Sequence, residues 1–246
     1  MASTIDGEVS LWISAIQDIG GRSPSDTTVL DFGCGRGVLV DRLCELDVNA
    51  YGCDVDPYWE GDNPRLREIQ RSPYRIPFDD ASVDLVLSTT VLEHAQNPRE
   101  LFYEIKRVLR PGGCAIHIYP AKWYLPYEPH IHVPLVNHLW PHTPRWWFAL
   151  WALLGIRNEF QEGLDWRKVT ELNEHYAANE LCYPTQRFYR KVSMEVYGNC
   201  EWPMHYFLSK SDGGFAPLYR RLPLKWFTAW VCQYTRMVLL VQRKTR

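Results

Sequence analysis

The stretch VLDFGCGRGVL, residues 29–39, decides the fold of this chain. An apolar run carries Asp31 near its end, three glycines follow at alternate positions, and a helical pattern begins after them. Because glycine tolerates φ > 0 and has no Cβ, the backbone can turn sharply there and a ligand can approach it closely. The stretch predicts a parallel strand that ends in a ligand-binding turn before a helix, with Asp31 placed to suit a cation.

The spacing of the glycines argues against a nicotinamide or flavin dinucleotide. Such a ligand requires G-x-G-x-x-G, and Val38 stands where the third glycine belongs. About twenty residues beyond the turn, a second short strand ends at Asp54, the distance at which a carboxylate accepts hydrogen bonds from a ribose diol. The pattern therefore indicates a ligand that contains ribose and lacks a pyrophosphate.

A strand with D-x-G-x-G-x-G and an acid after the next strand resembles the class I S-adenosylmethionine-dependent methyltransferases. Residues 78–94, with their F-D and V-L-E-H elements, and residues 104–113, E-I-K-R-V-L-R-P-G-G, extend the resemblance to about residue 120. The resemblance implies an enzyme that uses S-adenosyl-L-methionine, with Asp31 near the amino group of the methionyl part and Asp54 on the ribose. The residues that we expect to contact the cofactor are Asp31, Gly33, Cys34, Gly35, Gly37, Asp54, Val55, Tyr74, Ser88 and Thr89.

One part of the family pattern is missing. The acid that commonly meets the adenine amine would fall at Ser72-Pro73, so we expect backbone groups near Tyr74 to hold the adenine instead. Cys34 lies inside the glycine turn, and we interpret it as a small filler beside the ligand rather than a nucleophile.

The expected fold class is α/β: a Rossmann-like class I methyltransferase fold with a seven-stranded, mostly parallel sheet whose last strand is antiparallel. We predict one domain over residues 1–246, with a cofactor-binding core (1–120), a substrate-binding or lid elaboration (121–232) and a closing strand (233–246). Helices are predicted at 5–19, 38–46, 97–110, 144–156, 159–180 and 185–197, a further helical region around 226–230, and strands at 28–31, 114–119, 201–208 and 237–241.

Composition excludes several classes of protein. The formal net charge of −2 gives no general attraction for nucleic acid. Residues 1–20 lack a basic start with a continuous apolar run, and no stretch reaches the roughly 18 apolar residues of a membrane span, so we expect a cytoplasmic protein. The seven cysteines include no C-x-x-C pair, which favours reduced thiols.

A segment rich in proline, histidine and tyrosine follows the last methyltransferase motif. Its His130 is our first candidate for a general base, then His132 or His94, with Glu128 orienting the imidazole. These residues favour O-methylation of a small-molecule acceptor, and the E-P-H stretch is loosely similar to methyltransferases of surface-polysaccharide biosynthesis. The alternatives are N- or C-methylation, a lipid-linked acceptor, a non-catalytic binding protein, or polar residues that only tie a lid to the sheet.

Neither a metal site nor the oligomeric state follows from this pattern. The spacing of His130, His132 and Glu128 matches no specific zinc signature, so we predict no metal.

Aromatic residues concentrate in the second half of the chain. The helix predicted at 144–156 is apolar over most of its circumference, which favours burial under a substrate lid, although such a helix could instead contact a membrane surface. We expect residues 140–151 and 226–230, with six tryptophans, to cover the carboxyl edge of the sheet as a lid.

Overall fold

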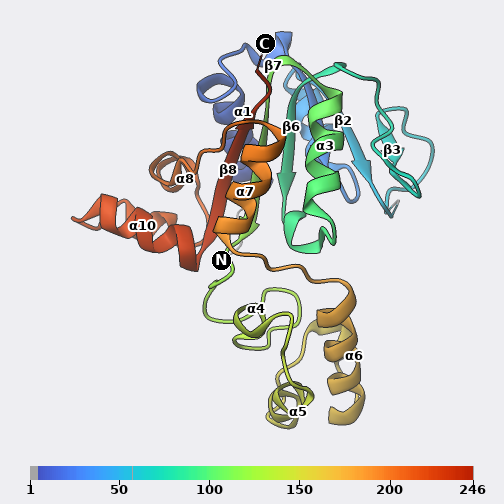
Figure 1. The fold of residues 1–246 in the computed structure, drawn as a ribbon, viewed down its shortest axis with the longest axis vertical. Coiled ribbons are helices and arrows are strands. Elements are labelled where there is room, and N and C mark those ends of the chain that lie inside the picture. Colours follow the sequence, from blue (N-terminus) through green and yellow to red (C-terminus); the bar gives the residue numbers. More distant parts are fainter. Residues whose placement is uncertain (1–4, 57, 246) are drawn as a thin grey trace.

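The computed structural model describes residues 5–56 and 58–245 and shows an α/β fold (Figure 1). Its main sheet has the order β3-β2-β1-β6-β7-β8, in which the first five strands are parallel and β8 runs antiparallel to β7. The strands are β1 (Thr28–Phe32), β2 (Asn49–Asp54), β3 (Leu66–Glu68), β6 (Val83–Thr89), β7 (Leu109–Pro120) and β8 (Met237–Arg243). The expected mostly parallel sheet with an antiparallel last strand is confirmed.

The sheet has six strands within the described residues, and the prediction of seven was wrong. The strand predicted at 201–208 is reduced to a single bridge between Glu201 and Val241, and the chain then turns into helix α8 (Met204–Lys210). Pro203 explains the break, because proline has no N–H with which to continue a ladder along β8. The short pair β4 (Gln70–Arg71) and β5 (Tyr74–Arg75) forms a separate hairpin.

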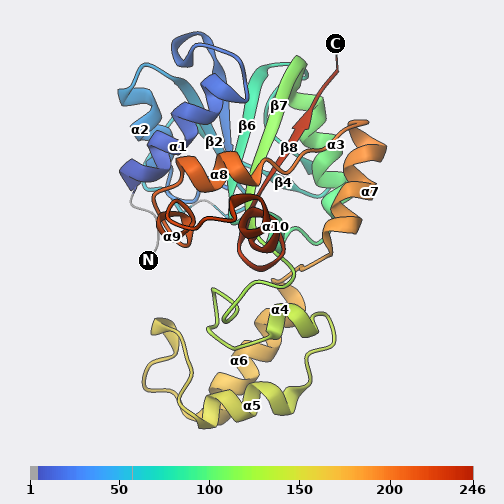
Figure 2. The same ribbon diagram turned by 90° about the vertical axis from the view of Figure 1, so that its left-hand side faces the viewer.

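Helices cover both faces of the sheet, so most residues of its central strands are buried. Helices α1 (Ile5–Asp18), α2 (Val38–Glu45) and α8 lie on one face, and α3 (Pro98–Val108) and α7 (Gln186–Val196) lie on the other (Figure 2). The residues of β6 from Val83 to Ser88 are all buried, as two-sided burial of a parallel strand requires. Asn97 caps α3 by accepting a hydrogen bond from the Glu100 N–H, and Pro98 occupies the first helical position, as the sequence predicts.

Residues 121–184 form a lobe below the carboxyl ends of the parallel strands (Figure 1). It contains α4 (Val136–Leu139), α5 (Arg145–Leu153), a 3₁₀ turn (Glu159–Gln161) and α6 (Trp166–Asn179). The lobe has an apolar cluster of its own, separate from the core of the sheet: Ile131, Val133, Val136, Phe148, Ala177, Leu181 and Tyr183. Helices α7 and α8 return to the main core.

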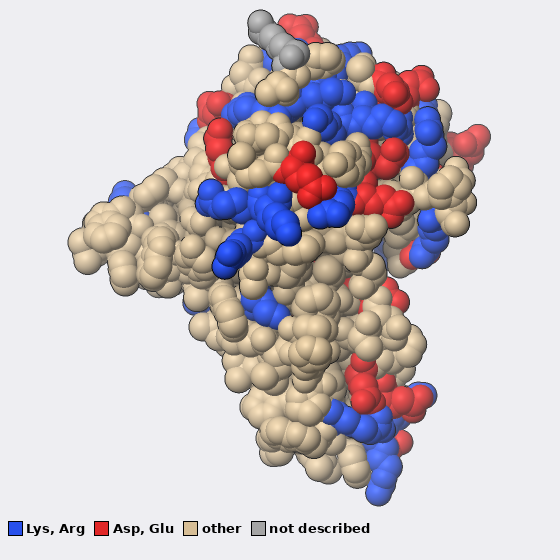
Figure 3. All heavy atoms as spheres, in the orientation of Figure 1, with Lys and Arg blue, Asp and Glu red and all other residues tan. Residues whose placement is uncertain are grey.

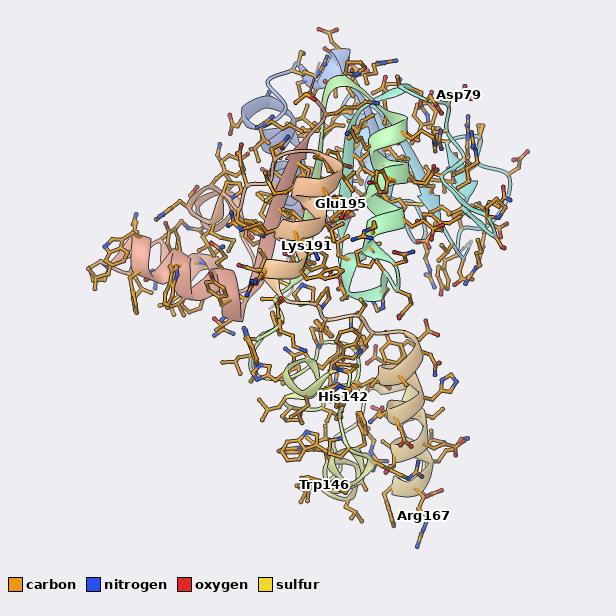
Figure 4. All side chains as sticks on the ribbon, viewed as in Figure 1. Asp79, His142, Trp146, Arg167, Lys191 and Glu195 are labelled. Atoms are coloured by element: carbon orange, nitrogen blue, oxygen red, sulfur yellow. The ribbon has the colours of Figure 1, made fainter. Side chains whose placement is uncertain are left out.

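The aromatic segments do not join into one lid, so that expectation was wrong. Helix α5 lies at the lower end of the lobe, while α10 (Lys225–Thr235), which follows the short α9 (Ala216–Tyr219), projects from the side of the sheet (Figures 1 and 2). The predicted burial of the helix at 144–156 was also wrong: it buries only Phe148 and Ala152, and Trp146 is 62% exposed at the tip of the lobe (Figure 4). Helix α5 packs on α6 and on the segment 131–136, where Phe148 joins the apolar cluster of the lobe and Nε1 of Trp147 donates to the Pro134 carbonyl at 2.7 Å.

None of the helices within the described residues is both long and apolar enough to cross a bilayer.

Candidate functional site

The glycine turn after β1 has the geometry that its sequence predicts. Gly33 and Gly35 have φ of 82° and 52°, and the Gly33 N–H donates to the Cys53 carbonyl at 2.8 Å, which fixes the turn against the end of β2. A Cβ on Gly33 would lie 2.3 Å from Cγ2 of Val91, whereas a Cβ on Gly35 would have no neighbour within 4 Å. Gly33 therefore allows close packing on the loop after β6, and Gly35 borders open space where a ligand can approach.

Asp54, at the end of β2, holds this turn from the side. Its Oδ2 accepts the Gly35 N–H at 2.8 Å and its Oδ1 accepts the Val55 N–H at 2.7 Å. A carboxylate offers about four acceptor directions, so Asp54 has capacity left for the hydroxyls of a ribose at the open side of Gly35. Asp54 and Val55, both predicted to contact the cofactor, therefore lie beside the turn, and their contact with the cofactor stays a prediction.

Asp31 lies in an acidic environment beside the turn. Burial, together with the nearby carboxylates of Glu8 and Asp54, raises the pKa of Asp31 to about 8. Glu8 comes from α1, and its Oε1 accepts the Thr89 hydroxyl at 2.9 Å. Three acids around one buried position fit a cationic group such as the amino group of a methionyl moiety.

Glu8 is a site residue that sequence reasoning missed. A signal existed, because Glu8 lies four residues before the fully buried Trp12 and so shares its inward face on the helix. The sequence did not show that this face meets the end of β6.

The other predicted cofactor residues have different surroundings. Cys34 is buried against Gly52, and burial raises the pKa of its thiol, which supports a packing role. Tyr74 is half-buried in the β4–β5 hairpin, and burial also raises the pKa of its phenol. Ser88 is fully buried, and its Oγ lies 2.7 Å from Nδ1 of His117.

A second polar cluster joins the loop after β6 to the lobe. Nε2 of His94 lies 3.2 Å from Nε2 of His130, and Nδ1 of His130 lies 2.6 Å from Oε1 of Glu128. Burial and the neighbouring His130 lower the pKa of His94. Burial opposes protonation of His130 too, but the hydrogen bond and charge of Glu128 outweigh it and raise the pKa of His130.

Glu128 is a fully buried carboxylate with a complete set of donors. Its Oε2 accepts the backbone N–H groups of His130 at 2.8 Å and Ile131 at 2.9 Å, and its Oε1 accepts the Tyr183 hydroxyl at 2.9 Å. Burial alone would raise the pKa of Glu128, but these bonds and His130 lower it. Glu128 therefore orients His130 as a carboxylate, in the relation that the sequence predicts for a base and its orienting group.

Glu93 was not predicted as a site residue, although it precedes His94 directly. It is 1% exposed, and neither of its carboxylate oxygens has a hydrogen-bond partner among the described residues. Burial raises the pKa of Glu93 to about 8. Sequence alone gives no signal for a carboxylate left unpaired, because that depends on the lobe closing over the loop.

His132 lies apart from the Glu128–His130–His94 chain. It has φ of 60°, and its ring contacts that of Tyr127 at 5.4 Å between centroids. His132 and His130 both line a pocket of about 570 Å³ in the lobe, together with Asn158, Phe160, Tyr176 and Glu180.

The two groups of predicted residues meet through one short loop. Val91 packs against Gly33 of the turn, and His94, three residues later, reaches His130 of the lobe. The geometry thus places a ribose-compatible turn and a carboxylate-backed imidazole pair at the two ends of residues 91–94, on the carboxyl side of the sheet.

The first half of the chain is similar in sequence to known methyltransferases. A family model described as "Methyltransferase domain" matches residues 30–117. An uncharacterized methyltransferase of Mycobacterium sp. (strain JLS) is 34% identical over 124 residues, which are 49% of this chain and 47% of that protein. A second, from Mycolicibacterium vanbaalenii, is 35% identical over 126 residues, 49% and 48% of the two chains. The chain spans about half the length of the curated relatives that it matches.

Solved structures extend the likeness in fold to nearly the whole chain. An S-adenosylmethionine-dependent methyltransferase from Mesorhizobium loti aligns with a TM-score of 0.57 at 15% identity, covering 98% of this chain and 100% of that one. The plantazolicin methyltransferase, in a complex with S-adenosylhomocysteine, aligns with a TM-score of 0.55 at 13% identity, covering 98% and 85%.

Proposed function

Because the chain contains a methyltransferase domain, in the fold of the S-adenosylmethionine-dependent methyltransferases, we propose that it transfers a methyl group from S-adenosylmethionine to a small-molecule acceptor. The observation that carries this proposal is the glycine turn, where Gly35 borders open space and Asp54 and Asp31 stand beside it. Asp54 would accept the ribose hydroxyls, and Asp31 with Glu8 would bind the amino group. The bound cofactor supplies an electrophilic sulfonium methyl group.

The acceptor that we propose is a hydroxyl group, most specifically one on a sugar or a related metabolite of glycan or natural-product biosynthesis. A hydroxyl nucleophile must lose its proton, and an imidazole backed by a carboxylate suits that task. His130 is the first candidate, because Glu128 fixes its ring and its Nε2 faces away from Glu128. The chain's other contribution is to hold the two reactants in line.

Turnover of a substitution variant tests the role of His130. We expect His130→Ala to lower turnover about 10²- to 10⁴-fold at saturating cofactor and acceptor, the range of general acid–base contributions. His142→Ala is the matched control, because His142 is an exposed histidine on the same lobe (Figure 4). Full turnover in His130→Ala would place the base elsewhere or indicate an acceptor, such as an amine, that needs none.

The acceptor itself requires a direct screen. The protein is incubated with methyl-labelled cofactor and a panel of nucleotide sugars, lipid-linked glycans, small phenols, amines and RNA. Label in a sugar hydroxyl supports the proposal, and label in a nitrogen or carbon position redirects it to N- or C-methylation. Cofactor binding without any transfer across the panel would favour a non-catalytic binding protein.

A further inference from the structure

We propose that Glu93, His94 and His130 form a binding site for a divalent transition-metal cation, with Zn²⁺ as the reference ion. One ligand atom from each residue lies within 4.8 Å of the others. Glu93 and His94 come from the loop after β6, and His130 comes from the lobe, so the site would clamp the lobe to the sheet. The sequence predicted no metal, because the spacing of His130, His132 and Glu128 matches no zinc signature; this proposal departs from that prediction and uses a different set of residues.

The hydrogen bonds of the two imidazoles point both free nitrogens at the same position. Nδ1 of His94 lies 2.8 Å from the Glu180 carbonyl oxygen, which can only accept, so this nitrogen carries the proton. Nδ1 of His130 faces the Glu128 carboxylate, whose other oxygen already accepts two backbone N–H groups, so it is protonated as well. In the neutral rings, both Nε2 atoms therefore present lone pairs to one another at 3.2 Å.

Such an arrangement is typical of metal-binding histidines. Ligating imidazoles usually donate their second N–H to a carboxylate or a backbone carbonyl, and His130 and His94 have one partner of each kind. Two nitrogens at about 2.0–2.1 Å from a tetrahedral Zn²⁺ lie about 3.3–3.4 Å apart. The observed 3.2 Å is close to that separation.

Glu93 completes the ligand set and is the independent observation that points to a cation. Its side chain is buried, and both of its oxygens lack hydrogen-bond partners among the described residues. A buried carboxylate without a partner is costly, and a cation bound to it removes that cost. Two imidazoles and one carboxylate form a set used by catalytic zinc and by non-haem iron, with positions left open for other ligands.

The rival explanation is a proton in place of the metal. His130 would then be an imidazolium that donates to His94, and Glu93 would be a neutral acid. That arrangement also explains the short distance between Nε2 of His94 and Nε2 of His130 as a hydrogen bond. It predicts no stoichiometric binding of a metal.

The consequence for catalysis rests on the proposed function. With a metal bound, Nε2 of His130 would be a ligand and could not take the acceptor's proton, so the general-base role proposed above would belong to the metal-free protein. The acceptor hydroxyl would bind the cation at an open position, its O–H bond would break more easily, and the proton would pass to solvent water.

Metal binding is tested without cofactor or acceptor. The full-length protein is freed of metal with a chelator and titrated with Zn²⁺ by calorimetry, and Co²⁺ is titrated in parallel because its visible absorption reports tetrahedral ligation. We expect one ion per chain for the wild type, with affinity lowered at least 100-fold in Glu93→Gln, His94→Ala and His130→Ala and unchanged in His142→Ala. Zn²⁺ should raise the melting temperature of the wild type and of His142→Ala only.

Two controls keep the result decisive. Circular dichroism and S-adenosylmethionine affinity show whether each variant is folded, and His94→Gln replaces His94→Ala if the latter is not. Absence of stoichiometric binding in the wild type, or equal binding in all variants, would overturn the proposal in favour of the proton. Zn²⁺ binding without methyl transfer would support the metal site and refute the proposed function. Methyl transfer by a protein that binds no metal would support the proposed function and refute the metal site.

Discussion

Asp54 holds the backbone of the glycine turn with the same carboxylate that we propose for the ribose. A hydrogen bond to a charged group contributes about 1.5–3 kcal/mol, so Asp54→Ala should weaken cofactor binding about ten- to a hundredfold. Asp79→Ala is the control, since Asp79 is exposed at the far end of the sheet (Figure 4). Calorimetry with S-adenosylmethionine measures both, and an unchanged affinity in Asp54→Ala would remove Asp54 from the site.

Asp31 should give cofactor binding a dependence on pH. Burial, with Glu8 and Asp54, raises its pKa to about 8, so at pH 7 the free protein holds most of this carboxyl in the protonated form. A cationic amino group favours the carboxylate, so binding should release close to one proton and tighten as the pH rises toward 8. Calorimetry in buffers of different ionisation enthalpy measures the release, which should disappear in Asp31→Asn. Equal binding enthalpies in all buffers would contradict the prediction.

The same shift predicts how Asp31 affects folding. The carboxyl has a higher pKa in the folded state than its ordinary 3.8, so the folded state binds more protons between about pH 4 and 8. The raised pKa of Asp31 therefore makes its full stabilising contribution to the free energy of unfolding below pH 4, and this contribution is lost as the pH rises through 8. Asp31→Asn should flatten this part of the stability profile, measured by urea unfolding at several pH values. A slope identical to that of the wild type would assign the dependence to other groups.

Site residues whose positions follow from spacing along the chain can be predicted from the sequence, and those brought together by tertiary packing cannot. Asp31 and Asp54 follow from their positions at the ends of neighbouring strands, and Glu128 follows from its closeness to His130 in the chain. Glu8 and Glu93 do not, because α1 and the lobe bring them into place from elsewhere. The pairing of His94 with His130 spans 36 residues and has no local signal.

At the scale of secondary-structure elements, two glycines of the turn after β1 can be compared by the same substitution, because both have φ > 0 and their surroundings differ. Both Gly33→Ala and Gly35→Ala place a side chain at φ > 0, which costs about 1–2 kcal/mol. Gly33→Ala should destabilise the protein more, because only its Cβ would also clash with the Val91 side chain. Urea unfolding measures the two differences. Val91→Ala in the Gly33→Ala background should restore part of the loss, and no restoration would mean that the contact is relieved elsewhere.

A buried stripe together with a cap predicted the bounds of α3 well, whereas apolar content alone misled two other predictions. Helix α3 has both a buried stripe and its Asn97 cap, and its observed bounds, Pro98–Val108, fall within the predicted range 97–110. The strand predicted at 201–208 had apolar residues but contained Pro203, and it became helix α8. The helix at 144–156 was correctly predicted to be a helix, but the prediction that it is buried was wrong. Apolar content does not reveal whether a partner surface exists.

For the molecule as a whole, charge and apolar surface are separated. Lysines, arginines and acids crowd the surface over the sheet, whereas the projecting α10 and much of the lobe show few charges in the same view (Figure 3). On α10, Trp226 and Trp230 are 68% and 56% exposed, and Phe227 lies beside them. Exposed aromatic side chains with basic neighbours, here Lys225, are typical of protein surfaces that contact membranes.

This separation yields a prediction about peripheral membrane binding. Burying about 60 Å² of each of the three aromatic side chains in an interface would contribute about 1.5 kcal/mol apiece, so each exchange for serine should weaken partitioning about tenfold. We expect the wild type to sediment with vesicles containing anionic lipid, and Trp226→Ser/Phe227→Ser/Trp230→Ser to remain in the supernatant. Trp146→Ser, at the tip of the lobe (Figure 4), tests the lobe as the alternative contact. Equal sedimentation of the triple variant and the wild type would exclude α10, and loss of sedimentation in Trp146→Ser alone would assign the contact to the lobe.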